Sequence, residues 1–141
     1  KNIIQLDNVG KPFNLSVNTM SGSTYNTRDH LGKIVFIDFF ATFCRPCIKN
    51  TQNLVSLKDK YGDKISVLII STDRDENKMR QYQSNLKYKF ATHYDPNGRD
   101  SKYKTDWGAM LGHMYIINKD GKLYDIHGNK DIFNKVEKLI Q

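Results

Sequence analysis

A strand gives way to a helix within the stretch Asp38-Phe39-Phe40-Ala41-Thr42-Phe43-Cys44-Arg45-Pro46-Cys47. Upstream, residues 34–40 are apolar at every position except Asp38, which is typical of a central strand covered on both faces. Downstream of Cys44 the period changes to 3.6, with one helical face made by Ile48, Thr51, Leu54, Val55, Leu57 and Tyr61. This helix is expected to reach about Lys60, and Gly62 is a stop signal.

The rest of the chain predicts an alternating α/β order around this junction. Before the junction we expect a hairpin within residues 1–30 that turns near Met20-Ser21-Gly22. After the first helix we expect a strand at 65–71, a helix from Asp75 with Met79, Tyr82 and Leu86 at helical spacing, and a short strand at 90–93. A poorly defined stretch through Lys104 then leads to a hairpin of 114–118 with 122–127 and to a final helix with apolar residues Ile132, Phe133, Val136, Leu139 and Ile140. The right-handed crossover rule places the start of the first helix beyond the carboxyl end of strand 34–40. Ligand chemistry in such sheets usually lies there, so the two cysteines occupy the predicted site.

Length and composition restrict the function classes. The chain has 141 residues, of which 38% are apolar and 26% charged, so one domain with a sizeable core is expected over residues 1–141. Its apolar runs are too short to span a bilayer. The net charge of +7 is spread as +1, +3, +2 and +1 over residues 1–43, 44–74, 75–110 and 111–141. This spread argues against nucleic-acid binding, which needs basic residues gathered on one face.

The cysteine pair is placed where sulfur chemistry is favoured. At a helix start, unsatisfied N–H groups and the helix dipole stabilise a Cys44 thiolate, and Arg45 adds a nearby cation. Pro46 is tolerated in the first turn, and Cys47 returns to the same face one turn later. We therefore expect Cys44 to be the exposed nucleophile and Cys47 the sheltered resolving thiol.

Two plainer interpretations of the pair stay open. Free cysteines are often ordinary core residues. A structural zinc site would need two further ligands, and the remaining candidates, His30, His93, His113 and His127, show no paired spacing.

Asp38 is the second candidate. On a strand that is apolar on both faces its carboxyl should point into the interior, where ionisation is costly and the pKa is raised. Such a group could take the proton from Cys47, directly or through water, when that thiol must attack. The alternative is an exposed aspartate at a strand edge.

Residues 36–47 resemble the active-site strand and helix of the thioredoxin superfamily, and within it the TlpA/ResA-like thiol-disulfide oxidoreductases of the bacterial cell envelope. Supporting matches are Gly10-Lys11-Pro12-Phe13-Asn14-Leu15, Leu31-Gly32-Lys33 and Ile116-Ile117-Asn118-Lys119-Asp120-Gly121-Lys122. The resemblance implies an α/β, thioredoxin-like three-layer fold with a central mixed β-sheet, helices on both faces and an N-terminal hairpin extension at 1–30. It also implies a helix–strand insertion at 75–105, a redox pair of Cys44 and Cys47, and a buried acid at Asp38.

Two positions depart from the family pattern. The residue before the first cysteine is usually Trp, and Phe43 keeps an aromatic side chain there. The family's cis-proline position is occupied by Gly112. Since a cis bond without proline costs about 2.5–4 kcal/mol, we expect a trans Leu111–Gly112 bond or a rebuilt loop. The expected substrate contacts are Phe43, Arg45, Pro46, Leu111 and Gly112.

The leading functional prediction is thiol-disulfide exchange without a cofactor, in the reducing direction that the resemblance favours. Its implied partners are a disulfide-containing protein substrate and an electron-donor thiol protein, in the bacterial periplasm or cell envelope, with a possible membrane tether outside the chain. The alternative is a thioredoxin-fold copper chaperone that uses Cys44, Cys47 and His113, although such proteins usually space their cysteines more widely. A peroxidase is a third option, but the motif lacks the Thr and Pro framing expected around a peroxidatic cysteine.

Overall fold

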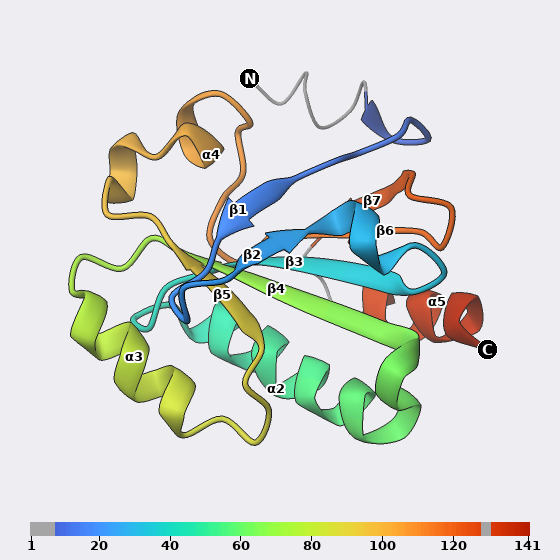
Figure 1. Ribbon diagram of the computed structural model, residues 1–141, viewed down its shortest axis with the longest axis horizontal. Coiled ribbons are helices and arrows are strands. Elements are labelled where there is room, and N and C mark those ends of the chain that lie inside the picture. The colour runs from blue at the N-terminus through green and yellow to red at the C-terminus, as the bar shows by residue number, and fades with distance from the viewer. Residues whose placement is uncertain (1–7, 128–130) are drawn as a thin grey trace.

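The computed structural model describes residues 8–127 and 131–141, and within them the main sheet has five strands (Figure 1). Their spatial order is β5 (Ala91–Tyr94), β4 (Ile65–Ser71), β3 (Ile34–Phe40), β6 (Met114–Ile117) and β7 (Leu123–His127). The pairs β3–β4 and β4–β5 are parallel, whereas β3–β6 and β6–β7 are antiparallel. The predicted mixed sheet is confirmed.

Three helices cover one face of this sheet: α2 (Arg45–Tyr61), α3 (Glu76–Ser84) and α5 (Asp131–Ile140) (Figure 1). Alternate residues of the central strands point toward them and form a continuous apolar core. Its fully buried members include Ile34, Phe36, Phe40, Cys47, Leu54, Ile65, Ile69, Met79, Met114, Ile116 and Val136. The motif helix α2 is thus fixed directly against the central strand β3.

The opposite face is covered by a small antiparallel hairpin, β1 (Ser16–Asn18) and β2 (Thr24–Asn26), together with the one-turn helix α4 (Lys102–Thr105) (Figure 1). The hairpin is tied to the sheet by a 2.7 Å hydrogen bond between the buried hydroxyls of Tyr25 and Ser66. Burial raises the pKa of Tyr25 to about 12, with the Ser66 hydrogen bond acting in the opposite direction. The three predicted layers are confirmed, and this second face is covered by a β-hairpin as well as by a helix.

Aromatic rings fill the space between this hairpin, α4 and the sheet. The indole of Trp107, the only tryptophan in the sequence, lies 4.7 Å from the ring of Tyr103, 5.7 Å from Phe13 and 5.9 Å from Tyr115 between centroids. Phe39 of β3 joins the same cluster through its ring contact with Tyr115 at 4.9 Å. The ring cluster links the back of the strand that precedes the cysteines to the second layer.

Most predicted elements are confirmed, and the differences have local causes. Strands 34–40 and 65–71 have the predicted bounds, and α2 ends at Tyr61, followed by the predicted stop residue Gly62 as its C-cap with a φ of +56°. Helix α3 stops at Ser84, so Leu86 lies beyond it. The stretch predicted to be poorly defined contains α4, which is capped by Ser101. This helix is too short to show a helical period in the sequence.

Within residues 8–127 and 131–141, three 3-10 turns connect the larger elements: η1 (Thr27–His30), η2 (Gly62–Lys64) and η3 (Gly98–Asp100). Across the described parts of the chain, every helix is too short or too polar to cross a bilayer.

Candidate active site

Cys44 occupies the position at which α2 begins. Strand β3 ends at Phe40, and Cys44 is the N-cap residue of a helix that starts at Arg45 and has Pro46 in its first turn. The Cys44 sulfur accepts a hydrogen bond from the backbone N–H of Cys47 at 3.3 Å. A donor aimed at the sulfur and the positive end of the helix dipole both stabilise a thiolate at Cys44.

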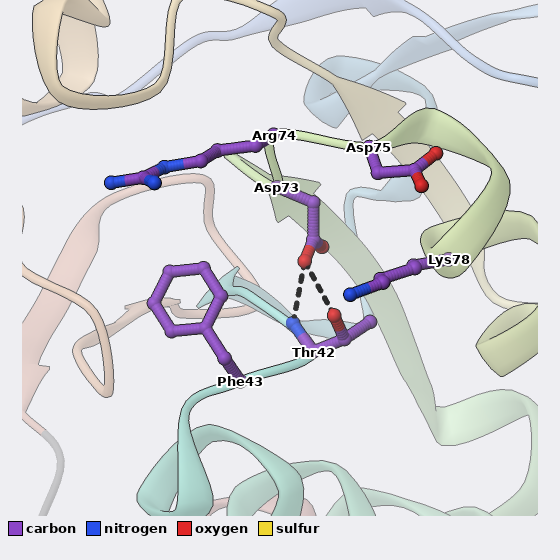
Figure 2. Close-up of a pocket in the computed structure, with 6 residues that line it drawn as sticks. All are labelled: Thr42, Phe43, Asp73, Arg74, Asp75 and Lys78. Atoms are coloured by element: carbon purple, nitrogen blue, oxygen red, sulfur yellow. Dashed lines mark hydrogen bonds between the residues drawn. The ribbon is translucent and has the colours of Figure 1, made fainter.

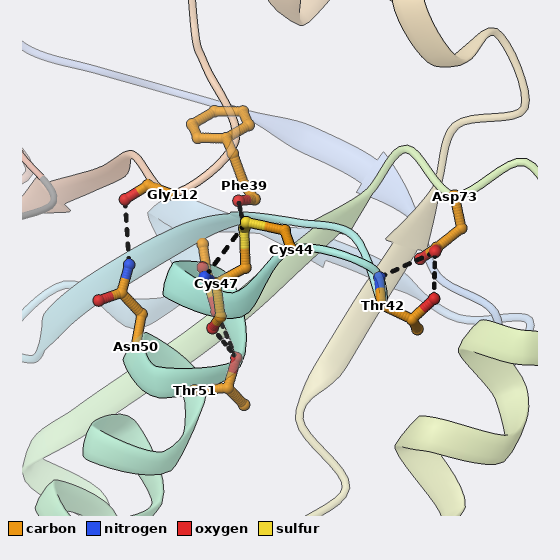
Figure 3. Close-up of a disulfide and its surroundings, with 9 residues drawn as sticks. Phe39, Thr42, Cys44, Cys47, Asn50, Thr51, Asp73 and Gly112 are labelled. Atoms are coloured by element: carbon orange, nitrogen blue, oxygen red, sulfur yellow. Dashed lines mark hydrogen bonds between the residues drawn. A yellow bond between two sulfur atoms is a disulfide. The ribbon is translucent and has the colours of Figure 1, made fainter.

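The two cysteines form a disulfide, with their Cα atoms 5.3 Å apart (Figure 3). Cys47 is completely buried, whereas Cys44 is partly exposed. The Cys47 sulfur lies 3.5 Å from the carbonyl oxygen of Phe39 on β3. A second molecule can therefore approach the sulfur of Cys44 and not that of Cys47.

Asp38 lies in the interior beneath this helix. Its exposed fraction is 0%, so the prediction that its side chain points inward is confirmed. Its Oδ2 atom is 2.9 Å from the hydroxyl of Thr51, and Oδ1 is buried without a hydrogen-bond partner among the described residues. Burial raises the pKa of the Asp38 carboxyl to about 7, and the hydrogen bond from Thr51 acts in the opposite direction.

The loop before β6 approaches the cysteines through Gly112. No cis peptide bond occurs in residues 8–127 or 131–141, so the Leu111–Gly112 bond is trans, one of the two predicted outcomes. The backbone N–H of Gly112 donates to the Phe39 carbonyl at 3.2 Å, and its own carbonyl accepts from Asn50 Nδ2 at 3.0 Å (Figure 3). The loop is thereby fixed to both β3 and α2.

A buried carboxylate fixes the segment just before Cys44. Asp73, which follows β4, accepts hydrogen bonds through Oδ1 from the backbone N–H of Thr42 at 2.8 Å and from its hydroxyl at 2.6 Å (Figure 3). Its Oδ2 accepts from the hydroxyl of Ser71 at 2.7 Å. Three donors compensate the charge of Asp73 and hold the ends of β3 and β4 together.

Large apolar side chains are exposed in the segment around Cys44 and in the loop before β6. Phe43 is 66% exposed, Met110 is 63% exposed, and Arg45 and Pro46 are exposed as well, whereas Leu111 is partly buried and packs against the core. Beside Phe43 lies an open pocket of about 610 Å³ (Figure 2). Its lining consists of Thr42, Phe43, Asp73, Arg74, Asp75 and Lys78.

The histidine of the copper alternative is engaged elsewhere. Nδ1 of His113 accepts a hydrogen bond from the backbone N–H of Met110 at 3.2 Å. In the described parts of the chain, no three His, Cys, Asp or Glu side chains gather in a way that could hold a metal ion. Nothing in this geometry favours a copper site formed by Cys44, Cys47 and His113.

Sequence reasoning missed three polar residues that shape the site. Asn50 and Thr51 lie three and four positions after Cys47, so helical spacing alone places them on its face of α2. Asp73 follows the strand parallel to β3, and the carboxyl ends of neighbouring parallel strands share one edge. Both signals were present in the sequence, but which side chains meet across the edge depends on the register.

The mixed sheet with a Cys-x-x-Cys pair at the start of the helix after its central strand defines a thioredoxin-like protein. The sequence profile of the AhpC/TSA family matches residues 9–126, so the chain belongs to that family. The thioredoxin-like protein YneN of Bacillus subtilis is 28% identical over 115 residues, covering 79% of this chain and 66% of the relative. The thiol-disulfide oxidoreductase ResA of Bacillus thuringiensis is 28% identical over 112 residues, covering 78% of this chain and 63% of the relative. The chain thus spans just under two thirds of the length of these relatives.

Solved structures support the same fold. The thioredoxin domain of a thiol-disulfide oxidoreductase from Bacteroides vulgatus superposes with a TM-score of 0.75 at 22% identity, covering 94% of this chain and 98% of that one. A thioredoxin-like protein from the same organism gives a TM-score of 0.74 at 25% identity, covering 92% and 86%. The predicted thioredoxin-like fold and the resemblance to ResA are confirmed.

Proposed function

We propose that this chain is a thiol-disulfide oxidoreductase whose reactive groups are Cys44 and Cys47. The observation that carries the proposal is the asymmetry of the pair: Cys44 is partly exposed at a helix N-cap, and Cys47 is bonded to it and fully buried. Exchange chemistry needs one accessible, acidic sulfur and one protected sulfur within reach of it. The names of the ResA relatives agree with this activity.

In the reducing direction, the Cys44 thiolate attacks one sulfur of a substrate disulfide. A mixed disulfide forms, and the other substrate sulfur leaves as a thiolate that takes a proton from solvent. Cys47 then gives its proton to the Asp38 carboxylate, attacks the Cys44 sulfur and releases the second substrate thiolate. The substrate gains two electrons, and the Cys44–Cys47 pair becomes the disulfide, which an electron-donor thiol protein must reduce again.

The substrate is proposed to lie across the exposed side chains that flank Cys44 in the sequence and the loop before β6. Phe43, Arg45 and Pro46 are exposed on one side, and the Leu111–Gly112 loop lies on the other. Gly112 has no side chain, and a Cβ atom placed there would lie 3.7 Å from that of Pro46. Because Gly112 lacks a side chain, the loop can lie close to Pro46, and the substrate peptide is proposed to contact both segments from the solvent side.

The proposal extends to the direction of electron transfer, the cellular location of the protein and its domain organisation. We infer a reductase of the bacterial periplasm or cell envelope that acts on protein disulfides, supported by the similarity to proteins named ResA. The proposal includes a membrane tether outside the chain. It also treats the chain as one thioredoxin-like domain with a hairpin extension at 1–30 and an insertion at 75–105.

Reduction of insulin disulfides tests the activity. The wild-type protein should precipitate insulin chains in the presence of a small dithiol, and Cys44→Ser should abolish the acceleration, since the remaining thiol, that of Cys47, is buried. Cys47→Ser should stall as a mixed disulfide visible by mass spectrometry. The matched control is Ser56→Ala on the exposed side of α2, which should react like the wild type. Equal rates for Cys44→Ser and the wild type would refute the proposal.

Equilibration with glutathione buffers tests the direction. Potentials of related proteins span about −270 to −120 mV, and a reductase belongs near the lower end. A measured value above about −150 mV would assign the oxidising direction instead.

A further inference from the structure

The hydroxyl of Thr51 lies between the buried acid and the backbone of the resolving cysteine. Its oxygen is 2.9 Å from Asp38 Oδ2 and 3.0 Å from the carbonyl oxygen of Cys47. Thr51 is itself completely buried. A hydroxyl carries one proton and can donate to only one of these two acceptors at a time.

The two acceptors correspond to two protonation states of the acid. When Asp38 is ionised, Thr51 donates to its Oδ2 atom, because a hydrogen bond to a charged acceptor is the stronger one. When Asp38 is protonated on Oδ2, the carboxyl O–H donates to Thr51, and Thr51 turns its own proton to the Cys47 carbonyl. Both arrangements use the same atom positions, so the proton can arrive and leave without movement of the backbone.

Few other polar groups lie near the Asp38 carboxyl among the described residues. Asp38 is paired in the sheet with Ile69 of β4 and Met114 of β6, neither of which has a polar side chain. From α3, the half-buried phenol of Tyr82 faces the pair. Burial raises the pKa of Tyr82, the hydrogen bond to Thr51 lowers it, and the charge of Asp38 raises it. Among the described residues, Thr51 makes the only hydrogen bond to the Asp38 side chain.

We propose that Thr51 is a positioning residue that controls when Asp38 gives up and takes a proton. Its hydroxyl stabilises the carboxylate that must receive the Cys47 proton, and it reorients once that proton has been transferred. The role in turnover rests on the proposed function, whereas the effect on Asp38 does not. The effect of Thr51 on the protonation equilibrium of Asp38 is measurable without any substrate.

The first test is an NMR titration of the Asp38 side-chain carboxyl carbon in the oxidised protein. Thr51→Val keeps the shape of the side chain but removes the hydroxyl, and it should raise the pKa of Asp38 by about one to two units, a ten- to hundredfold tighter hold on the proton. Thr51→Ala should give the same direction of shift, so the test remains if the valine variant does not fold. Thr51→Ser should titrate like the wild type.

Thr92→Val is the matched control, because Thr92 is also buried and its hydroxyl also contacts a backbone carbonyl, that of Phe90. It should leave the titration of Asp38 unchanged. An unchanged pKa of Asp38 in folded Thr51→Val or Thr51→Ala would overturn the inference, and so would an equal shift in Thr92→Val.

Turnover supplies the second readout. In Thr51→Val, the pH profile of mixed-disulfide release should move to higher pH by the shift measured for Asp38, whereas a merely structural defect would lower the rate at all pH values alike. If the wild type has no exchange activity but the NMR shift is as expected, the proposed function and the role of Thr51 in turnover are refuted, and only the effect of Thr51 on Asp38 stands.

Discussion

At the scale of single residues, Asp38 makes folding depend on pH. In the unfolded chain it ionises near pH 3.8, whereas burial keeps it protonated in the folded chain up to about pH 7. Between these values the folded state binds the extra proton, so the free energy of unfolding falls as the pH rises from about 4 to about 7. Above pH 7 the ionised buried carboxylate costs the folded state up to roughly 4 kcal/mol, because each pKa unit is worth about 1.36 kcal/mol.

Asp38→Asn should remove this cost. We expect the oxidised variant to be more stable than the wild type at pH 8 by a few kcal/mol, with the difference vanishing near pH 4. Urea unfolding followed by circular dichroism across this range measures it. Asp63→Asn, which changes an exposed carboxylate of η2, is the control. A constant difference at every pH would show that Asp38 does not titrate in this interval.

Single residues were also where the sequence was most informative. A charged residue inside the otherwise apolar run 34–40 identified Asp38, and spacing from Cys44 identified Cys47. The role of Thr51 was not predictable, since it occupies an ordinary position on the apolar face of α2. Its importance appears only once Asp38 is found within 2.9 Å.

At the scale of elements, the site is a junction of three segments: the end of β3, the start of α2 and the loop that precedes β6. Gly112 has a φ of +91° and donates its N–H to Phe39. Proline would lose that donor and requires a φ near −65°, so the family's usual residue does not fit this backbone. The backbone conformation of this loop therefore suits glycine and not proline at position 112.

Two substitutions test this adaptation. Gly112→Ala should lower the stability by about 1–2 kcal/mol, the cost of a side chain in the left-handed region, because its Cβ meets only ordinary contacts. Gly112→Pro should lower it further instead of restoring a family feature. Gly22→Ala, at a φ of +88° with open space around it, is the matched control for backbone strain. Equal or greater stability of Gly112→Pro would contradict this account.

Elements were predictable to the extent that their patterns were long. The strands at 34–40 and 65–71 and the helix α2 have clear periods, and their bounds were close to those observed. The helix α4 has four residues, of which Tyr103 is buried, and the Ser101 side chain caps its start. No local period exists over such a length.

At the scale of the whole molecule, the two faces of the sheet are covered in different ways. Helices, among them α2 with Cys47, cover one face, whereas the hairpin β1–β2 covers much of the other. Leu15, Val17 and Tyr25 pack there against the sheet. The sequence predicted a hairpin, but it could not predict which surface the hairpin covers, because that contact joins residues far apart in the chain.

Val17→Asp should therefore destabilise the entire domain. Val17 is 8% exposed, and a carboxylate buried against apolar side chains of the sheet should cost roughly 3 kcal/mol or more. Thermal unfolding by circular dichroism should show a lower midpoint for the whole transition. Ser16→Asp, at an exposed position of the same strand, should change little. An unaltered midpoint in Val17→Asp would show that the hairpin is dispensable for stability.

The solitary indole of Trp107 gives this molecule a built-in optical probe. It touches Phe13 of the segment leading to the hairpin and Phe39, whose backbone carbonyl lies beside the Cys47 sulfur. Its emission spectrum therefore comes from one known place, between the outer layer and the reverse side of the redox centre. We expect opening and closing of the cysteine bond, and detachment of the outer layer, to change this emission, so that both events can be followed without any label.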